Sequence, residues 1–498
     1  MSKRSSRSLS RSPDRSSARA RFGLQIVPVL LLVSACATAP AQGQDGRSMV
    51  ADYVDSRSEM FAETAQQIWD LAEVGYQENE SSALLQAHLT EAGFKVEAGV
   101  AGMPTAFVAE WGSGSPVIGI LAEFDALPGI NQARSPEREP VEGKGAGHAC
   151  GHHMFGTGST AAGMAVKDWM ERTGQVGTIR VYGTPAEEGG AGKVYMVREG
   201  LFEDVDAVLH WHPGDVNDAS PETSLANKSA KFRFTGISAH AAAAPERGRS
   251  ALDGVEAMNL MVNMMREHVP QETRIHYVIT QGGFAPNVIP DFAEVFYYVR
   301  NPESDNVKEI FERVVAAAEG AAQGTGTTMD YEVIHGIYSM VPNDALGRVM
   351  DANLRRVGGL HYDAQERQFA EALQRSLPDD APPLSSAAEI QAYEQKQAGG
   401  STDVGDVSSV VPTAGLSAAT WVPGTAAHSW QAVASGGTTI GNKGMMVAAK
   451  TLAMTVVDLF LQPRVLTEAK AEYVQRMGED FVYESLVGDR APPLDYRR

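Results

Sequence analysis

The sequence contains very little cysteine and comparatively little positive charge. Only Cys36 and Cys150 occur among 498 residues, so the chain can form at most one internal disulfide. Lysine and arginine total 42 against 62 aspartates and glutamates, which gives a net charge of −20 and a pI of about 5.1. This acidic balance argues against a nucleic-acid partner.

The chain also lacks an uninterrupted apolar run that would span a bilayer comfortably. The apolar stretch from Leu24 to Val33 is too short, and it follows seven lysines and arginines within residues 1–21. This combination predicts a secretory signal over residues 1–35. The later stretch "GMMVAAKTLAMTVVDLFLQ" is interrupted by Lys and Asp, and we expect it to be a core helix rather than a transmembrane one.

The signal ends in "LVSAC", which resembles a bacterial lipobox with Cys36 as the lipid acceptor. Ala37 follows, where an Asp would favour retention in the inner membrane. We therefore expect a lipoprotein anchored on the periplasmic side of the outer membrane, without a transmembrane helix. The alternative is a plain signal peptide cut near Ala41, which would give a soluble periplasmic protein.

With Cys36 lipidated, Cys150 has no disulfide partner. It lies in "GHACGHH" (147–153), which holds three of the chain's twelve histidines within a glycine-rich stretch that we do not expect to be helical. Packing alone gives no reason to gather imidazoles around a thiol, whereas sulfur and nitrogen donors together suit a transition metal. The stretch predicts part of a metal site whose remaining ligands lie elsewhere.

The order of elements predicts an α/β sandwich interrupted by a second, smaller unit. We expect a tether at 36–50, then a first segment of the larger domain at 51–228, with a helical pattern over 58–92 and a helix over 158–170. Residues 229–342 read β-α-β-β-α-β, the order of a ferredoxin-like unit, which we call the lid. The larger domain resumes over 343–465 and is followed by a C-terminal tail at 466–498.

Three further stretches supply candidate ligands. "PAEEGG" places Glu187 beside Glu188, and neighbouring side chains on an extended chain point to opposite sides. One carboxylate can therefore bind metal while the other faces substrate. "LHWHPG" places His210 and His212 on one strand face, so either can be a ligand, and "TAAHSW" offers His428.

In this order, "HACGHH", "PAEEG", "HWHP", "SAHAA", "NVIPD" and "AAHSW" resemble the di-metal amidohydrolases of peptidase family M20. "GHACGHHMFG", "GSTDVGDVS" and "AHSWQ" are most similar to the p-aminobenzoyl-glutamate hydrolase branch of B type. The resemblance implies a sandwich-type di-metal catalytic domain with an inserted ferredoxin-like lid that forms a homodimer. It also implies a small acyl-amino-acid or dipeptide substrate.

Position by position, the resemblance implies five metal ligands, which are Cys150, His152, Glu188, His212 and His428. Asp125 in "EFDALPG" is expected to hold a ligand imidazole in one tautomer. His153 stands where auxin-conjugate-type relatives have Asp, and we expect it to contact the ligands without binding metal. Thiolate and imidazole donors favour two zinc ions, with manganese or cobalt as alternatives.

The implied reaction is hydrolysis of an amide by a metal-activated water, with Glu187 as general base. His240 of "SAH" and Asn287 of "NVIPD" are expected to stabilise the oxyanion, and in many relatives they come from the partner subunit. Arg300 is a candidate clamp for a substrate carboxylate, or else a surface arginine on a strand.

Two other functions remain open at this point. Cys150 could be a nucleophile with a histidine base, although no third orienting group is evident and the Glu187–Glu188 pair would have no role. The chain could also be a catalytically inactive metal- or peptide-binding surface lipoprotein, although Glu187 and every expected ligand are present.

Overall fold

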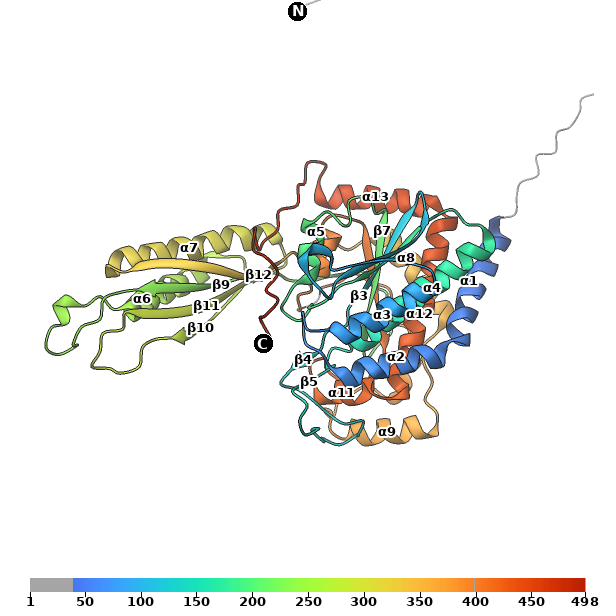
Figure 1. The fold of residues 1–498 in the computed structure, drawn as a ribbon, viewed down its shortest axis with the longest axis horizontal. Coiled ribbons are helices and arrows are strands. Elements are labelled where there is room, and N and C mark those ends of the chain that lie inside the picture. The colour runs from blue at the N-terminus through green and yellow to red at the C-terminus, as the bar shows by residue number, and fades with distance from the viewer. Residues whose placement is uncertain (1–38, 398, 498) are drawn as a thin grey trace, which may run out of the picture. The chain divides into compact units, whose positions relative to one another are not determined.

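The computed structural model describes residues 39–397 and 399–497, so the predicted signal peptide and Cys36 lie outside the described residues. A six-stranded mixed sheet forms the centre of the larger domain (Figure 1). Its strands, in spatial order, are β1 (Lys95–Ala98), β2 (Phe107–Ser113), β6 (Gly177–Gly183), β3 (Val117–Ala122), β7 (Ala207–Gly214) and β14 (Thr413–Ala419).

The last four strands of that order are mutually parallel, so their carboxyl ends meet at one edge of the sheet. Every residue of β3 is buried, as expected for a parallel strand covered on both faces. Glu123 and Asp125 follow β3, Glu187 and Glu188 follow β6, and His428 follows β14. In open α/β sheets this edge is where ligands bind.

Helices cover the sheet and contribute to one large apolar core. α4 (His152–Thr173) contacts β3, β6 and β7, and it lies beside α12 (Thr439–Leu461). Among the described residues, α12 is the one helix long and apolar enough to cross a membrane, but 89% of its most apolar window is buried in the protein. It is therefore a core helix, as its interrupted sequence predicts.

Other elements complete the larger domain. Its further helices are α1 (Ala39–Ser56), α2 (Ser58–Leu71), α3 (Asn79–Glu91), α5 (Gly192–Arg198), α8 (Asp344–Val357), α9 (Ala364–Gln374), α10 (Val404–Ser408), α11 (Trp430–Gly436) and α13 (Pro463–Met477). Two small sheets pair β4 (Leu127–Pro128) with β5 (Ala146–Gly147) and β8 (Glu222–Thr223) with β13 (Lys396–Gln397).

The lid has the predicted β-α-β-β-α-β order and its own apolar core. Its elements are β9 (Ala226–Thr235), α6 (Ala251–Met265), β10 (Arg274–Gln281), β11 (Phe292–Asn301), α7 (Ser304–Thr325) and β12 (Thr328–Ile337). The strands form an antiparallel sheet in the order β10-β11-β9-β12, with α6 and α7 packed beside it (Figure 1). This confirms the predicted α/β fold class with an inserted ferredoxin-like unit.

Three local predictions differ from the structure. The tether expected up to residue 50 overlaps α1, whose Val50 and Val54 are one turn apart and join the main core. The helical pattern over 58–92 is broken between α2 and α3, where Ala72 adopts a left-handed conformation with φ 46°. α4 begins at His152 rather than near 158, because Gly151 at φ 79° allows the chain to turn directly into the helix.

Candidate metal centre and active site

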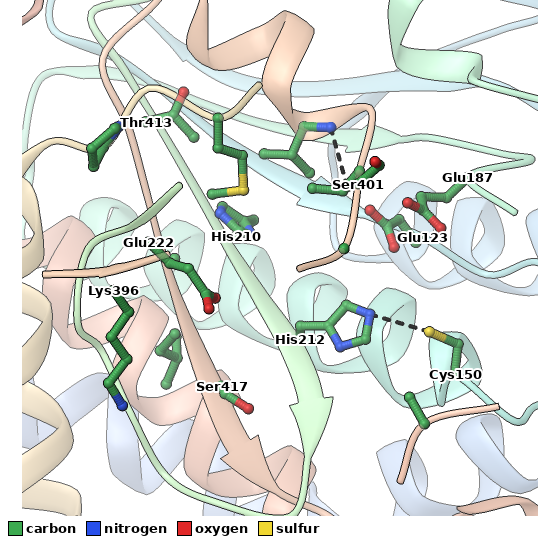
Figure 2. Close-up of a pocket in the computed structure, with 18 of the residues that line it drawn as sticks. Glu123, Cys150, Glu187, His210, His212, Glu222, Lys396, Ser401, Thr413 and Ser417 are labelled. Carbon is green, nitrogen blue, oxygen red and sulfur yellow. Dashed lines mark hydrogen bonds between the residues drawn. The ribbon is translucent and has the colours of Figure 1, made fainter. Parts of the chain in front are cut away.

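The loop that carries Cys150 is packed against the end of β7. A Cβ atom on Gly151 would lie 2.6 Å from the side chain of Pro213, so glycine permits this close approach. The packing places the Cys150 Sγ 3.4 Å from the His212 Nε2, and Figure 2 shows the two side chains facing each other. The His212 Nδ1 lies 2.7 Å from the Pro213 carbonyl oxygen, which leaves Nε2 available as a ligand.

Asp125 connects two predicted ligands. Its Oδ1 lies 2.9 Å from the Nδ1 of His152, and its Oδ2 accepts a hydrogen bond of 2.9 Å from the backbone amide of Glu188. The first contact occupies Nδ1 and leaves Nε2 directed towards Glu123 and the other candidate ligands, the arrangement that metal-binding histidines use. Burial lowers the pKa of His212, which keeps that imidazole in the neutral form needed to bind metal.

The two adjacent glutamates lie in separate clusters, as predicted, but they occupy a turn rather than the extended stretch from which the separation was expected. The Glu188 Oε1 lies 3.1 Å from the His428 Nε2, whereas Glu187 lies with Glu123 and His152. His428 reaches this position from a backbone with φ 59°, and its amide donates to the Ala149 carbonyl at 2.9 Å. This hydrogen bond holds His428 beside the Cys150 loop.

The described residues contain three groups whose ligand atoms lie within 4.8 Å of one another. They are Cys150–His152–His212, Cys150–Glu188–His428 and Glu123–His152–Glu187. Cys150 belongs to the first two groups, so one thiolate could touch two neighbouring ions. The His152 Nε2 lies 3.1 Å from the Glu123 Oε2, and the Glu188 Oε1 lies 3.1 Å from the His428 Nε2, so each of these buried atoms faces another residue of the same groups, as ligands of a shared ion do. The sulfur, nitrogen and oxygen donors therefore fit and support a divalent metal cofactor.

Burial raises the pKa of the Cys150 thiol, while the neighbouring His152 lowers it to a smaller extent. A nucleophile and a metal ligand both require the thiolate, so a bound cation would have to lower this pKa again. The position of Cys150 within two groups of candidate ligands favours the metal-ligand role over the nucleophile role.

Sequence reasoning missed three charged residues behind the ligands. Lys193 lies 2.7 Å from both the Glu123 Oε1 and the Asp403 Oδ1, and all three residues are at most 1% exposed. The Glu123 Oε2 is in turn 3.1 Å from the His152 Nε2. Glu123 precedes Asp125 by two residues, so strand alternation could have placed both on one side. Nothing local in the sequence indicates the pairing of Lys193 with Asp403.

Glu187 is partly exposed to the cavity. Burial raises its pKa well above the usual range, and the negative charges of Glu123 and Glu188 raise it further. Glu123 and Glu187 lie beside each other in Figure 2. A carboxyl group with a raised pKa next to candidate metal ligands is a recognised feature of catalytic sites.

Two predicted neighbours of the site lie apart from the ligand groups. The His153 Nε2 is 3.0 Å from the Gly436 carbonyl, and its ring lies against that of His148, so it faces away from Cys150. His210 lines the same cavity but belongs to none of the three groups, and burial lowers its pKa to about 3. Among the described residues, His212 is the histidine of this strand that meets Cys150.

The cavity has a volume of about 870 Å³ and extends from the ligand groups to the lid. Arg300 on β11 lines it, and the Arg300 Nε is buried without a hydrogen-bond partner among the described residues. Lys396 and Glu222 line a further part of the cavity (Figure 2). A cation without a partner at one end of a cavity can receive an anionic group of a ligand.

The structure does not bring His240 and Asn287 to the ligand groups. Both are exposed on the lid, where the Ala241 amide donates to the Asn287 carbonyl at 3.0 Å. Neither is among the described residues that line the cavity.

Comparisons with known proteins agree with this architecture. Residues 226–326 match the family model described as a peptidase dimerisation domain. The B-type component of the p-aminobenzoyl-glutamate hydrolase of Escherichia coli K12 is 40% identical over 456 residues, which cover 86% of this chain and 94% of that protein. The Xaa-Arg dipeptidase of Mus musculus is 28% identical and covers 86% of this chain and 92% of its own length.

Two solved structures share the fold. One is the Bacillus subtilis YxeP protein, described as a dinuclear metal-binding peptidase of the M20 family, with a TM-score of 0.56, 18% identity and coverage of 82% of this chain and 99% of its own. The other is the Klebsiella pneumoniae aminobenzoyl-glutamate utilization protein, with a TM-score of 0.57, 17% identity and coverage of 82% and 98%. With a relative 40% identical over nearly its whole length, this chain belongs to the M20 peptidase family, whose members are hydrolases of amide bonds.

Proposed function

We propose that the protein is a metal-dependent amidohydrolase that cleaves the amide bond of N-acyl or N-aroyl amino acids of the p-aminobenzoyl-glutamate type, or of small dipeptides. The observation that carries this proposal is the position of Glu187. Its carboxyl group reaches the cavity beside two candidate ligand groups that share Cys150. The ions are zinc in this proposal, with manganese or cobalt able to replace it.

Cys150, His152, Glu188, His212 and His428 would hold two divalent ions. When bound, these ions would lower the pKa of an attacking water from about 16 towards 7, and their charge would offset the raised pKa of Glu187. Glu187 then accepts a proton from that water and returns it to the leaving nitrogen. Asp125 keeps His152 in the tautomer that presents Nε2.

Substrate recognition is assigned to the lid end of the cavity. The Arg300 guanidinium has the fork geometry that binds a carboxylate through two hydrogen bonds, and its Nε lacks a partner among the described residues. The name of the 40% identical relative refers to a glutamate conjugate, which carries such carboxylates. These observations support a substrate with a free carboxylate on its amino-acid side.

The oxyanion that forms during the attack needs hydrogen-bond donors. In this proposal the donors are His240 and Asn287 of a second copy of the chain, because neither lines the cavity of its own subunit. The matched dimerisation domain and the exposed apolar residues of β10, which include Val278 and Ile279, support a homodimer formed through the lid.

The test is hydrolysis by the purified protein of a panel containing p-aminobenzoyl-glutamate, N-acetyl and N-benzoyl amino acids, and dipeptides with a basic second residue. We expect cleavage of at least one acyl or aroyl amino acid. Glu187→Gln should lower kcat by roughly 10²–10⁴-fold without reducing the metal content. The exposed residue Glu199 provides the control Glu199→Gln, which should retain wild-type activity.

Two results would contradict the proposal. Full activity of Glu187→Gln would remove the general-base assignment. Metal binding without turnover on any member of the panel would favour the alternative of an inactive metal- or peptide-binding lipoprotein.

A further inference from the structure

The segment of residues 478–497, which we call the strap, follows α13 and contains no helix or strand. Leu486 and Val487 within it are only 4% exposed, so the strap packs as part of the protein. Figure 1 shows it running from α13 past β12.

The middle of the strap contacts β12, the strand after which the chain returns from the lid to the larger domain. The Tyr338 hydroxyl, just after β12, donates to the Glu484 carbonyl at 2.9 Å. The Leu486 backbone lies so close to Gly336 that a Cβ atom there would be 2.9 Å from its carbonyl carbon. Arg490 forms an ion pair with Glu332 at 3.3 Å.

The end of the strap reaches the loop that carries Glu187 and Glu188. The Tyr496 hydroxyl and the Arg497 Nη2 both donate to the carbonyl oxygen of Glu188, at 3.0 and 2.6 Å. Gly75 makes room for this approach, because a Cβ atom there would lie 2.3 Å from the Tyr496 hydroxyl. The Tyr496 ring also lies edge-on to Tyr76, with 5.7 Å between ring centroids.

The loop that receives these bonds has a strained backbone. Ala186 and Ala191 adopt left-handed conformations with φ 59° and 55°, which are unfavourable for residues that carry a Cβ atom. Such conformations persist where surrounding contacts hold them. On one side, the Glu188 amide is held by Asp125 at 2.9 Å, and on the other its carbonyl is held by Tyr496 and Arg497.

We propose that Tyr496 and Arg497 are positioning residues that fix the Glu188 carboxylate for metal binding by anchoring its backbone carbonyl. Through the same strap, the loop is tied to the strand on which the lid joins the larger domain. The inference rests on the proposed metal centre, because it assigns Glu188 as a ligand. It predicts that loosening the strap weakens metal retention more than it weakens the fold.

The test compares the metal-loaded full chain with the double variant Tyr496→Phe/Arg497→Met. Metal release to an excess of chelator, kcat, KM and Tm are measured for each protein. Losing two hydrogen bonds to one carbonyl should accelerate metal release about tenfold and lower kcat more than it raises KM. The single variant Arg497→Lys keeps a donor and should recover most of the wild-type metal retention.

Matched controls remove similar bonds elsewhere. Tyr473 donates to the Ser409 carbonyl at 2.8 Å, and Arg355 donates to the Gln391 carbonyl at 2.6 Å. Tyr473→Phe and Arg355→Met should change Tm to a similar extent while leaving metal release and kcat at wild-type values. If the double variant does not fold, Tyr496→Phe alone should accelerate metal release about threefold.

Metal release within twofold of wild type from the double variant, or from Tyr496→Phe if the double variant does not fold, would overturn the inference. The same holds if the control variants release metal as fast as the strap variants, because the effect would then follow general stability. Wild-type protein that retains no divalent metal would instead refute the proposed metal centre itself, so the two failures are distinguishable.

Discussion

At the scale of single residues, Asp406 is a carboxyl group with no exposed surface inside the larger domain. The Tyr483 hydroxyl donates to it at 2.6 Å and the Tyr338 amide at 3.0 Å. Burial raises its pKa from 3.8 to about 7, and these hydrogen bonds oppose only part of that shift. Asp406 therefore couples the stability of the fold to pH.

The direction of this coupling follows from proton binding. Between about pH 4 and 7 the folded protein keeps a proton on Asp406 that the unfolded chain has released, so the contribution of this group to stability falls as pH rises. Asp406→Asn cannot ionise, and its Tm should therefore fall less steeply than the wild-type Tm over this range. Calorimetry at several pH values checks this, and a Tm difference between the two proteins that stays constant from pH 4 to 7 would contradict it.

Some residues of the candidate site can be predicted from the local sequence, and others cannot. Cys150, Glu188 and His428 lie in short motifs whose order along the chain carries the information, and the structure places them within 4.8 Å of one another. Lys193 and Asp403 are 210 positions apart and meet only because α5 and α10 pack together. Such a contact depends on the complete topology, so no local pattern predicts it.

Among the helices, α1 is one that the sequence does not predict, because most of its residues are polar or small. Few of its residues are apolar, which favours a tether, but Val50 and Val54 recur at helical spacing and are fully buried. Arg47 also pairs with Asp458 of α12. Met49, Val50, Tyr53 and Val54 all pack on the main core but lie close together near the end of α1, so the apolar pattern is too short to indicate a helix that begins at Ala39.

This interpretation of α1 gives a stability prediction. Val54→Ala should destabilise the protein by about 2 kcal/mol, since it removes buried methyl groups and leaves a cavity. Asp52→Ala changes an exposed residue on the same helix and should alter stability by less than about 0.5 kcal/mol. Thermal unfolding measures both variants, and equal Tm values for the two would mean that α1 does not pack as described.

For the whole molecule, the lid matters because it carries His240 and Asn287, which the proposed site receives from a second copy of the chain. The sequence predicts the β-α-β-β-α-β order, because alternating strands and periodic helices are local signals. No local pattern predicts that His240 and Asn287 lie away from the cavity, since their position depends on how domains and protomers assemble; only the family resemblance indicated it. β10 is an edge strand with exposed apolar residues, among them Val278 and Ile279, and such an edge invites pairing with another chain.

The proposed exchange of residues between protomers predicts complementation. Glu187→Gln and His240→Ala should each be nearly inactive alone. Co-expressed at equal levels, they should recover about a quarter of wild-type activity, because half of the dimers are mixed and each mixed dimer contains one complete site. Activity assays on the purified mixture check this. No recovery from a mixture shown to contain mixed dimers would mean that His240 acts within its own protomer.

In the proposed function, Cys150, His152, Glu188, His212 and His428 hold two divalent ions that amide hydrolysis requires. Titration of metal-stripped protein with zinc or manganese, followed by hydrolysis of the best substrate of the panel, tests this requirement. We expect no activity before metal is added, a rise up to two equivalents per chain and a plateau beyond them. Full activity of the stripped protein, or metal binding with no effect on the rate, would refute it.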